Sequence, residues 1–202
     1  MELAIKHLQK DSIMKRIIEQ SPDYKRDFDA GEDVYFALLE SIVSQQISVK
    51  AADSIFKRFC ELFDNNYPKA EFLLDLDIET LRTAGLSFQK INYLKNVAGF
   101  HLEYGIDFEK LQRLDDEAVV QYLIPIKGVG RWTVEMLLMF VLGREDVYPF
   151  DDLIVRQNTM KAYNVDLKGK ELKIKLFEIA QNWSPYRSLA CRYLWRFKGF
   201  ND

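Results

Sequence analysis

Apolar residues recur at steps of three and four along almost every segment of this 202-residue chain. Phe36, Leu39, Val43 and Ile47 form one such stripe. This spacing places apolar side chains on one face of an α-helix, whereas a half-buried strand needs alternation at steps of two. The sequence shows no strand-like alternation and no fixed period typical of helical repeats. The pattern therefore predicts an all-α fold of about ten short helices.

Capping and turn residues divide this helical pattern into segments. Ser87 is placed to cap a helix from Phe88 to about Glu103, which Gly105 would end. Ser184 followed by Pro185 is typical of an N-cap with proline at the first helical position. No long linker separates the segments. At this length we expect one large domain or two small lobes.

Composition excludes several classes of protein. Hydrophobic residues make up 48% and charged residues 29% of the chain, as in soluble globular proteins. No apolar run approaches the roughly 18–20 residues that a bilayer demands, and charges occupy the N-terminal stretch where a signal peptide needs apolar residues. We therefore expect an intracellular protein with no membrane contact, placed in the cytoplasm or nucleoid of a prokaryote or in the nucleus of a eukaryote.

Cysteine and histidine give no sign of a metal or redox centre. Cys60 and Cys191 are too few for a four-thiolate zinc or iron–sulfur site, and we expect both to be buried thiols. His7 and His101 have no ligand partner nearby in sequence, so we expect ordinary surface or core residues. No motif for ATP or a redox cofactor appears, and the expected cofactor set is empty.

The charge is unevenly distributed. Residues 153–202 carry 10 Lys+Arg and 4 Asp+Glu (net +6), and residues 1–152 carry 18 and 27 (net −9), which together give −3. The overall negative charge argues weakly against a nucleic-acid partner. A basic section on an acidic body is a local electrostatic signal for one, although a solvated face explains it equally well.

The most informative stretch runs from Leu123 to Thr133. Pro125 must end one helix, Gly128 and Gly130 make a tight turn, and a second helix begins at Arg131 or Trp132. We expect positive φ at both glycines and outward N–H groups that form an anion site at the helix N-terminus. Such a site suits a DNA phosphate held without reading sequence, although ordinary tight turns also use Gly-x-Gly. The residues expected to bind DNA here are Lys127, Gly128, Val129, Gly130, Arg131 and Thr133.

This stretch resembles the helix–hairpin–helix of the DNA glycosylase superfamily. Further segments are similar to its alkylpurine branch, DNA-3-methyladenine glycosylase II, and cover about residues 35–200 in the expected order. These segments are residues 44–52, 85–87, 148–153, 183–190 and 193–195. Larger bacterial members also carry an N-terminal β-containing domain. With about 34 residues at that place, this chain resembles the short all-helical form.

The resemblance implies a single domain, residues 1–202, with two helical lobes flanking a cleft that binds DNA and holds the active site. Lobe one would span about 35–123. Lobe two would combine about 1–34 with 124–202, and the hairpin would occupy 124–131. The implied partner is double-stranded DNA containing alkylated bases, and we expect a monomer.

Asp151 and Asp152 stand at the start of a helix about 20 residues after the hairpin. From the residues alone both read as capping residues. The resemblance implies that Asp152 is the catalytic carboxylate, with Asp151 as the cap or a support. Breaking an N-glycosidic bond develops positive charge on the sugar, which a fixed anion stabilises while it orients or deprotonates water. A cationic alkylpurine leaves without a general acid.

The residue after Arg131 separates two mechanisms. In glycosylases that also cut the DNA backbone, a lysine at a similar position attacks the sugar as an amine; here it is Trp132. The resemblance therefore implies a monofunctional enzyme that leaves an abasic site after releasing 3-methyladenine or 7-methylguanine. The alternatives are a non-catalytic helix–hairpin–helix module, a glycosylase with lyase activity, or a glycosylase for other damaged bases.

A flipped base needs a replacement for lost stacking, and aromatic rings supply it. On spacing alone Trp132 and Trp195 are core residues, but the resemblance implies that both line the base pocket. Met136 occupies a pocket position where some relatives have an aromatic residue, and Gln45 is a further lining candidate. Trp183 is expected to pack under Ser184.

Three assignments rest on position alone or on the resemblance. Gln45-Gln46-Ile47 reads as a polar step within an apolar helix stripe, either merely exposed or facing the cleft, and the resemblance implies that Gln46 wedges into the gap left by the flipped nucleotide. Arg187 either holds the capping region together or touches a phosphate. The backbone carbonyls expected to hold a monovalent cation, as family hairpins do, are those of Ile124, Ile126 and Val129.

Overall fold

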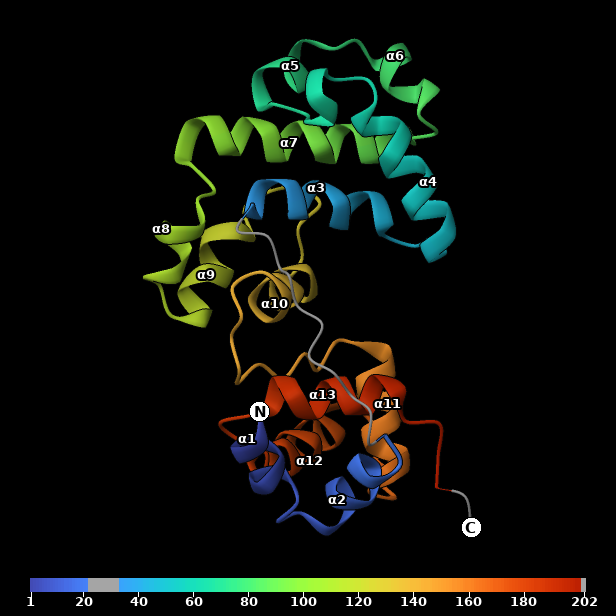
Figure 1. The fold of residues 1–202 in the computed structure, drawn as a ribbon, viewed down its shortest axis with the longest axis vertical. Coiled ribbons are helices and arrows are strands. Elements are labelled where there is room, and N and C mark those ends of the chain that lie inside the picture. The colour runs from blue at the N-terminus through green and yellow to red at the C-terminus, as the bar shows by residue number, and fades with distance from the viewer. Residues whose placement is uncertain (22–32, 201–202) are drawn as a thin grey trace. The chain divides into compact units, whose positions relative to one another are not determined.

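The computed structural model describes residues 1–21 and 33–200, and every regular element in these ranges is a helix (Figure 1). The all-α prediction is confirmed, although the described chain has more helices than the expected number because several have only five or six residues. The helices are α1 (Glu2–Leu8), α2 (Ser12–Glu19), α3 (Val34–Ser44), α4 (Val49–Cys60), η1 (Asp64–Asn66), α5 (Ala70–Asp75), α6 (Ile78–Thr83), α7 (Phe88–Tyr104), α8 (Phe108–Gln112), α9 (Asp116–Leu123), α10 (Arg131–Phe140), α11 (Leu153–Ala162), α12 (Gly169–Gln181) and α13 (Arg187–Arg196).

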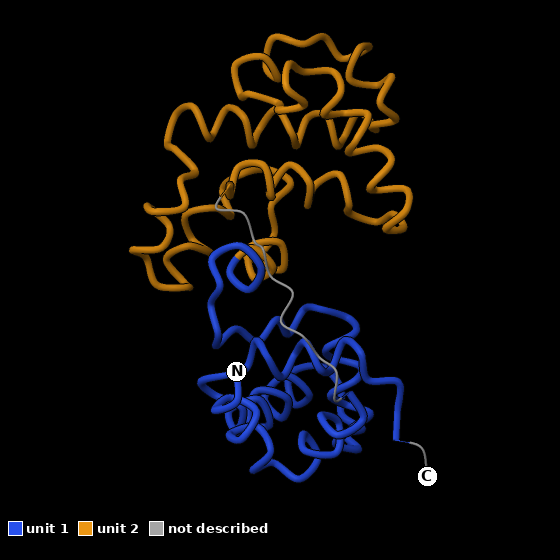
Figure 2. Tube along the Cα trace, viewed as in Figure 1, with its two compact units in different colours: residues 1–29, 138–202 blue, residues 30–137 orange. Residues whose placement is uncertain are grey.

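The chain divides into two compact units, residues 1–29 with 138–202 and residues 30–137 (Figure 2). The sequence placed a boundary near residue 124, which would join the hairpin to the C-terminal part. The contacts instead keep the hairpin with residues 30–137. Side-chain amides explain this difference: Gln45 Nε2 donates to the Gly128 carbonyl at 3.1 Å, and Asn96 Nδ2 donates to the Lys127 carbonyl at 3.4 Å.

The unit of residues 30–137 is built on α3 and α7, which pack side by side in opposite directions (Figure 1). The Tyr35 ring near the start of α3 stacks on His101 near the end of α7, with centroids 4.6 Å apart. At the other end, Lys90 Nζ donates to the Val43 carbonyl at 2.5 Å. Burial of Lys90 lowers the pKa of its amine. The lysine thus binds the C-terminal end of one helix from the first turn of the other.

The helix α7 begins and ends where the sequence predicted. Ser87 Oγ accepts from the Lys90 amide at 3.2 Å, and Gly105 ends the helix with φ of 78°. These are local signals, read from residues next to the helix ends. The long helix then exposes one face and buries Ile91, Leu94 and Val97 completely.

The second unit surrounds Trp183, which is fully buried. The Trp183 indole N–H donates to the Tyr163 hydroxyl at 3.2 Å, and that hydroxyl donates to Asp11 Oδ2 at 2.8 Å. Asp11 Oδ1 in turn accepts from the amides of Ile13 and Met14 at the start of α2. A single hydrogen-bonded chain therefore joins α2, the end of α11 and the segment after α12.

The start of α13 was predicted wrongly. The helix begins at Arg187 with Tyr186 at the N-cap, so Pro185 does not occupy the first helical position. The Ser184–Pro185 peptide bond is cis. The Ser184 hydroxyl does not cap the helix but donates to Asp146 Oδ2 at 2.8 Å. A partner 38 residues away competes for the hydroxyl, which local sequence cannot show.

Both cysteines are buried free thiols, as expected. Burial raises the pKa of the Cys60 thiol to about 11. His101 Nδ1 accepts from the Ile106 amide at 3.1 Å, which makes this histidine a structural residue. Among the described residues, no helix combines the length and the apolar character needed to cross a membrane.

Candidate functional site

The hairpin turn depends on one glycine rather than two. The turn lies between α9, which ends before Pro125 as predicted, and α10. Gly128 has φ of 103°, and a Cβ there would lie 2.4 Å from Tyr93 Cγ. Gly130 does not have the expected positive φ, and a Cβ there would meet nothing within 4 Å. Gly128 is therefore required by the fold, whereas the space beside Gly130 is open.

The first turn of α10 presents amides at the mouth of the hairpin. The Val134 amide donates to the Gly130 carbonyl at 3.1 Å, so the amides before it precede the first intrahelical bond. Lys127 and Gly130 are exposed, whereas Val129 and Thr133 are buried. The Val129 amide already donates to the Ile126 carbonyl at 2.9 Å, so Val129 does not offer its N–H to an anion, and the buried Thr133 can serve one only through its backbone. The start of α10 is compatible with the anion site expected from the sequence, which stays a prediction.

The Arg131 guanidinium is engaged within the hairpin. Its Nη2 donates to both carboxylate oxygens of Glu117 at 2.7 Å, which ties α10 to α9. The hydrogen bond from Arg131 lowers the pKa of the Glu117 carboxyl. Arg131 thus holds the two hairpin helices together, and Lys127 is the exposed cation that the turn itself offers.

Gln45, Gln46 and Ile47 do not lie within a helix, which corrects the apolar-stripe interpretation. The helix α3 ends at Ser44, and Gln46 has φ of 61°, a backbone conformation that residues other than glycine rarely adopt. Gln46 is exposed, while Gln45 is half-buried and donates to the Gly128 carbonyl. The turn therefore anchors Gln45 on the hairpin and leaves the next side chain in solvent.

A cavity of about 430 Å³ lies beside this turn, within the unit of residues 30–137. Its walls include Gln45, Gln46 and Gly128, together with Gln89 and Tyr93 from the first turns of α7. Gln89 Nε2 donates to the Tyr93 hydroxyl at 2.7 Å. Sequence reasoning missed these two residues, because i, i+4 polar pairs on an exposed helix face are ordinary.

Trp132 and Met136 occupy one face of α10 at a spacing of four residues. The Trp132 side chain is 39% exposed, which does not fit the core position expected from spacing alone. Met136 is half-buried beside it in the helix. The face that carries this pair is therefore accessible along part of its length.

Asp152 is both the helix cap and the buried carboxylate of its unit. It is 8% exposed, and its Oδ1 accepts from the Val155 amide at 2.8 Å and from the Trp195 indole N–H at 3.0 Å. Because Asp152 is the N-cap of α11, the suggestion that Asp151 caps this helix is wrong. Asp151 is exposed. The two readings of the Asp-Asp pair, cap and functional carboxylate, thus concern the same residue.

Trp195 lies in α13 and is half-buried. Its ring stacks on Phe140, with centroids 5.6 Å apart and an interplanar angle of 30°. Phe140 therefore holds the face of the ring, and the hydrogen bond from the indole N–H to Asp152 holds its edge. A sequence can suggest the tryptophan, but not this bond across 43 residues.

The structure decides between the two roles considered for Arg187. Its Nε donates to Asp146 Oδ1 at 2.7 Å, and its Nη2 donates to Oδ2 at 2.9 Å. Burial raises the pKa of the Asp146 carboxyl, but the hydrogen bonds from Arg187 and Ser184 outweigh burial and hold that pKa below its usual range. Arg187 therefore holds the loop before Asp152, and Asp146 is a functional candidate that sequence reasoning missed.

Two kinds of comparison bear on these features. Residues 39–185 match the family described as HhH-GPD superfamily base excision DNA repair protein. DNA-3-methyladenine glycosylase 1 of Schizosaccharomyces pombe is 37% identical over 197 residues, which cover 95% of this chain and 85% of the relative.

Solved structures of similar fold also include 3-methyladenine DNA glycosylases. The structure of the Schizosaccharomyces pombe 3-methyladenine DNA glycosylase in complex with abasic DNA matches with a TM-score of 0.85 and 32% identity, over 98% of this chain and 99% of the other. A DNA-3-methyladenine glycosidase from Bacillus halodurans matches with a TM-score of 0.79 and 35% identity, over 94% and 86%.

Proposed function

The chain belongs to the HhH-GPD superfamily of base excision DNA repair proteins, and we propose that it is a monofunctional DNA glycosylase for alkylated purines. It hydrolyses the N-glycosidic bond of bases of the 3-methyladenine and 7-methylguanine type and leaves an abasic site. The partner is double-stranded DNA that contains such bases. We further propose that it acts as a monomer, in the nucleoid of a prokaryote or the nucleus of a eukaryote.

The observation that carries this proposal is the buried, oriented carboxylate of Asp152. Two donors, the Val155 amide and the Trp195 indole, fix its Oδ1 at the N-terminus of α11. A fixed anion in a site shielded from water stabilises positive charge on the sugar more than water does. The same carboxylate orients or deprotonates the attacking water. A helix cap alone would not require the indole.

The leaving group supplies the rest of the chemistry. An alkylated purine is already cationic, so it departs as a neutral base and needs no general acid. Trp132 and Trp195 are proposed as the aromatic residues that contact the base, with Met136 and Gln45 as further candidates. A cationic base over an indole face gains about 0.5–2 kcal/mol relative to a neutral one, and this difference favours damaged purines.

Base release is tested on a duplex with a single 7-methylguanine. We expect free base in the supernatant and an abasic site that breaks only on later treatment with alkali. Borohydride is expected to trap no covalent adduct, because Trp132 stands where an amine nucleophile would be needed. A trapped adduct would establish the lyase alternative. Duplex binding with no base release would establish the non-catalytic module.

Replacing Trp132 by alanine is expected to slow release of 7-methylguanine about tenfold, since the cation–π attraction is lost. Release of neutral hypoxanthine should change much less, because it has no charge for the ring to attract. The indole is 39% exposed, so the fold should tolerate the change. Trp132→Phe is the matched control and should restore part of the rate. Equal losses on both bases would contradict a charge-selective role for Trp132.

We propose that the protein holds DNA at the hairpin of residues 124–131 and at the turn of residues 45–47, which together form the DNA grip. The amides of the 127–133 segment other than that of Val129, which donates to the Ile126 carbonyl, are proposed to hold a backbone phosphate together with the Lys127 side chain and without reading sequence. Gln46 is proposed to enter the gap left by the flipped nucleotide. Two observations support this role. The Gln46 side chain is exposed on a backbone of positive φ, and the neighbouring Gln45 holds the turn in place through its bond to the Gly128 carbonyl.

A monovalent cation at the hairpin also fits the turn's oxygen atoms. The Lys127 and Gly128 carbonyls already accept side-chain amides, whereas no described residue donates to the Ile124 or Val129 carbonyl. The Ile126 carbonyl accepts the Val129 amide and retains a second lone pair. We propose these three oxygen atoms as the ligands of a cation that would add positive charge beside the phosphate.

A further inference from the structure

The loop of residues 141–152, which joins α10 to α11, lies along one face of α13. Three α13 residues at a spacing of three and four, Ser188, Cys191 and Trp195, contact successive parts of this loop. Ser188 binds the loop near its start, Cys191 Sγ lies 3.9 Å from the Val147 carbonyl, and Trp195 binds Asp152 at its end. Residues at this spacing share one helix face, so the helix holds the loop at three points in register.

The start of the loop is the most heavily bonded point. Asp146 takes two bonds from the Arg187 guanidinium, one from the Ser184 hydroxyl at 2.8 Å and a longer one from the Arg187 amide at 3.4 Å. Tyr186 provides no side-chain cap for α13. The carboxylate of Asp146 therefore lies at the positive end of α13 in place of a local cap.

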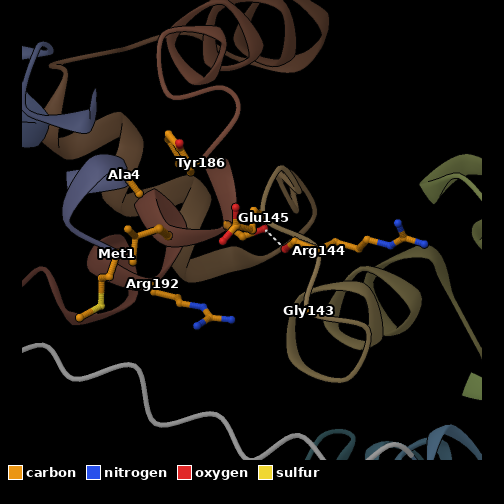
Figure 3. Close-up of a pocket in the computed structure, with 9 residues that line it drawn as sticks. Met1, Ala4, Gly143, Arg144, Glu145, Tyr186 and Arg192 are labelled. Atoms are coloured by element: carbon orange, nitrogen blue, oxygen red, sulfur yellow. Dashed lines mark hydrogen bonds between the residues drawn. The ribbon is translucent and has the colours of Figure 1, made fainter. Parts of the chain in front are cut away.

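Ser188 adds a second clasp from the same turn of the helix. Its Oγ accepts from the Val147 amide at 3.0 Å and donates to the Arg144 carbonyl at 2.7 Å. Its backbone amide donates to the Glu145 carbonyl at 3.0 Å. Figure 3 shows Gly143, Arg144 and Glu145 beside Tyr186 and Arg192, around a small cavity of about 30 Å³. The first half of the loop is thus bonded to α13 through both main chain and side chains.

We infer that Asp146 is a positioning residue for Asp152. By binding Arg187 and Ser184 at the head of α13, it sets the register of the loop on the helix, and this register brings the Asp152 carboxylate to the Trp195 indole. The inference rests on the proposed function only for its effect on catalysis. Its geometric part, the dependence of the Asp152–Trp195 contact on Asp146, is measured separately.

The test is Asp146→Asn, which keeps the shape and removes the charge that binds Arg187. The three tryptophans give three indole N–H signals in a ¹H–¹⁵N spectrum, and Trp195→Phe identifies the signal of Trp195. We expect the Trp195 signal to shift in Asp146→Asn. The Trp183 signal should stay, because that indole binds Tyr163 outside the loop. An unmoved Trp195 signal overturns the inference.

The rate of base release is measured on the same variant under single-turnover conditions. We expect a loss of about tenfold, since misplacing a reacting group by about 1 Å costs up to 100-fold. Binding of a duplex with a non-cleavable abasic analogue should change less than about threefold, because Asp146 lies outside the hairpin. A shifted Trp195 signal with an unchanged rate upholds the positioning and rejects the catalytic role of Asp152.

Two controls separate positioning from general loss of structure. Glu178→Gln breaks an exposed ion pair with Lys175 on α12 and should move neither the signal nor the rate. Ser188→Ala removes the second clasp and should reproduce the Asp146→Asn result, whereas Ser188→Thr keeps the hydroxyl and should restore the signal and most of the rate. If Ser188→Ala also leaves the Trp195 signal in place, the loop does not depend on the head of α13.

Discussion

Asp152→Asn is expected to lower the single-turnover rate of 7-methylguanine release about 100- to 1000-fold, because it removes the negative charge that we propose stabilises the positive sugar. The amide oxygen of asparagine can still accept from the Val155 amide and the Trp195 indole, and asparagine is among the best helix N-caps. The fold should therefore remain, with the chemistry removed. Release of free base is measured by chromatography, and duplex binding by fluorescence anisotropy.

Asp151→Asn is the matched control for this experiment. It makes the same chemical change one residue earlier, on an exposed side chain that does not cap α11. We expect its rate to stay within about twofold of the unmodified protein, as for most surface changes. Release at the unmodified rate by Asp152→Asn would remove this aspartate from the reaction. Equal slowing by both variants would indicate a general effect of charge rather than a positioned carboxylate.

Gly128→Ala is expected to destabilise the protein by about 3 kcal/mol. Two causes act together. The backbone φ of 103° is unfavourable for any residue with a Cβ, and that atom would lie 2.4 Å from Tyr93 Cγ. The added atom would also lie 2.7 Å from Tyr93 Cβ, which is fixed to the backbone of α7, so rotation of the ring does not relieve the clash. Urea unfolding followed by circular dichroism measures the change.

Gly130→Ala separates folding from DNA binding. A Cβ at this position meets nothing within 4 Å and the backbone is not left-handed, so stability should change by less than about 1 kcal/mol. Binding to duplex DNA should nevertheless weaken, because the added methyl group occupies space through which a phosphate reaches the amides of the turn. Normal binding by a folded Gly130→Ala protein would place the phosphate elsewhere.

The sequence predicts those parts of the fold that depend on neighbouring residues. Ser87 and Gly105 bound α7 as expected, and Pro125 follows the end of α9. Each of these signals acts within one helical turn. The prediction failed at Ser184, where a distant carboxylate takes the hydroxyl that would otherwise cap the helix. Capping preferences read from neighbouring residues can therefore be overridden by hydrogen bonds to residues far away in the sequence.

For the candidate site, the sequence names residues but not the contacts that hold them. The resemblance selected Asp152, but it did not reveal that this residue also caps α11 or binds Trp195. The bond between Asp146 and Arg187 joins residues 41 positions apart and leaves no periodic or motif signal. The apolar spacing continues through Ile47 and predicts one continuous helix, but α3 ends at Ser44 and Gln46 adopts a left-handed backbone conformation.

The bond from Gln45 to the Gly128 carbonyl joins two parts of the proposed DNA grip. One peptide unit separates the amide that holds the hairpin from the exposed side chain of Gln46. A phosphate bound at the hairpin and a Gln46 side chain inserted between the DNA bases would then lie a fixed distance apart. If both proposed roles hold, Gln46 would meet the duplex at one fixed distance from the bound phosphate, because Gln45 ties the two segments together.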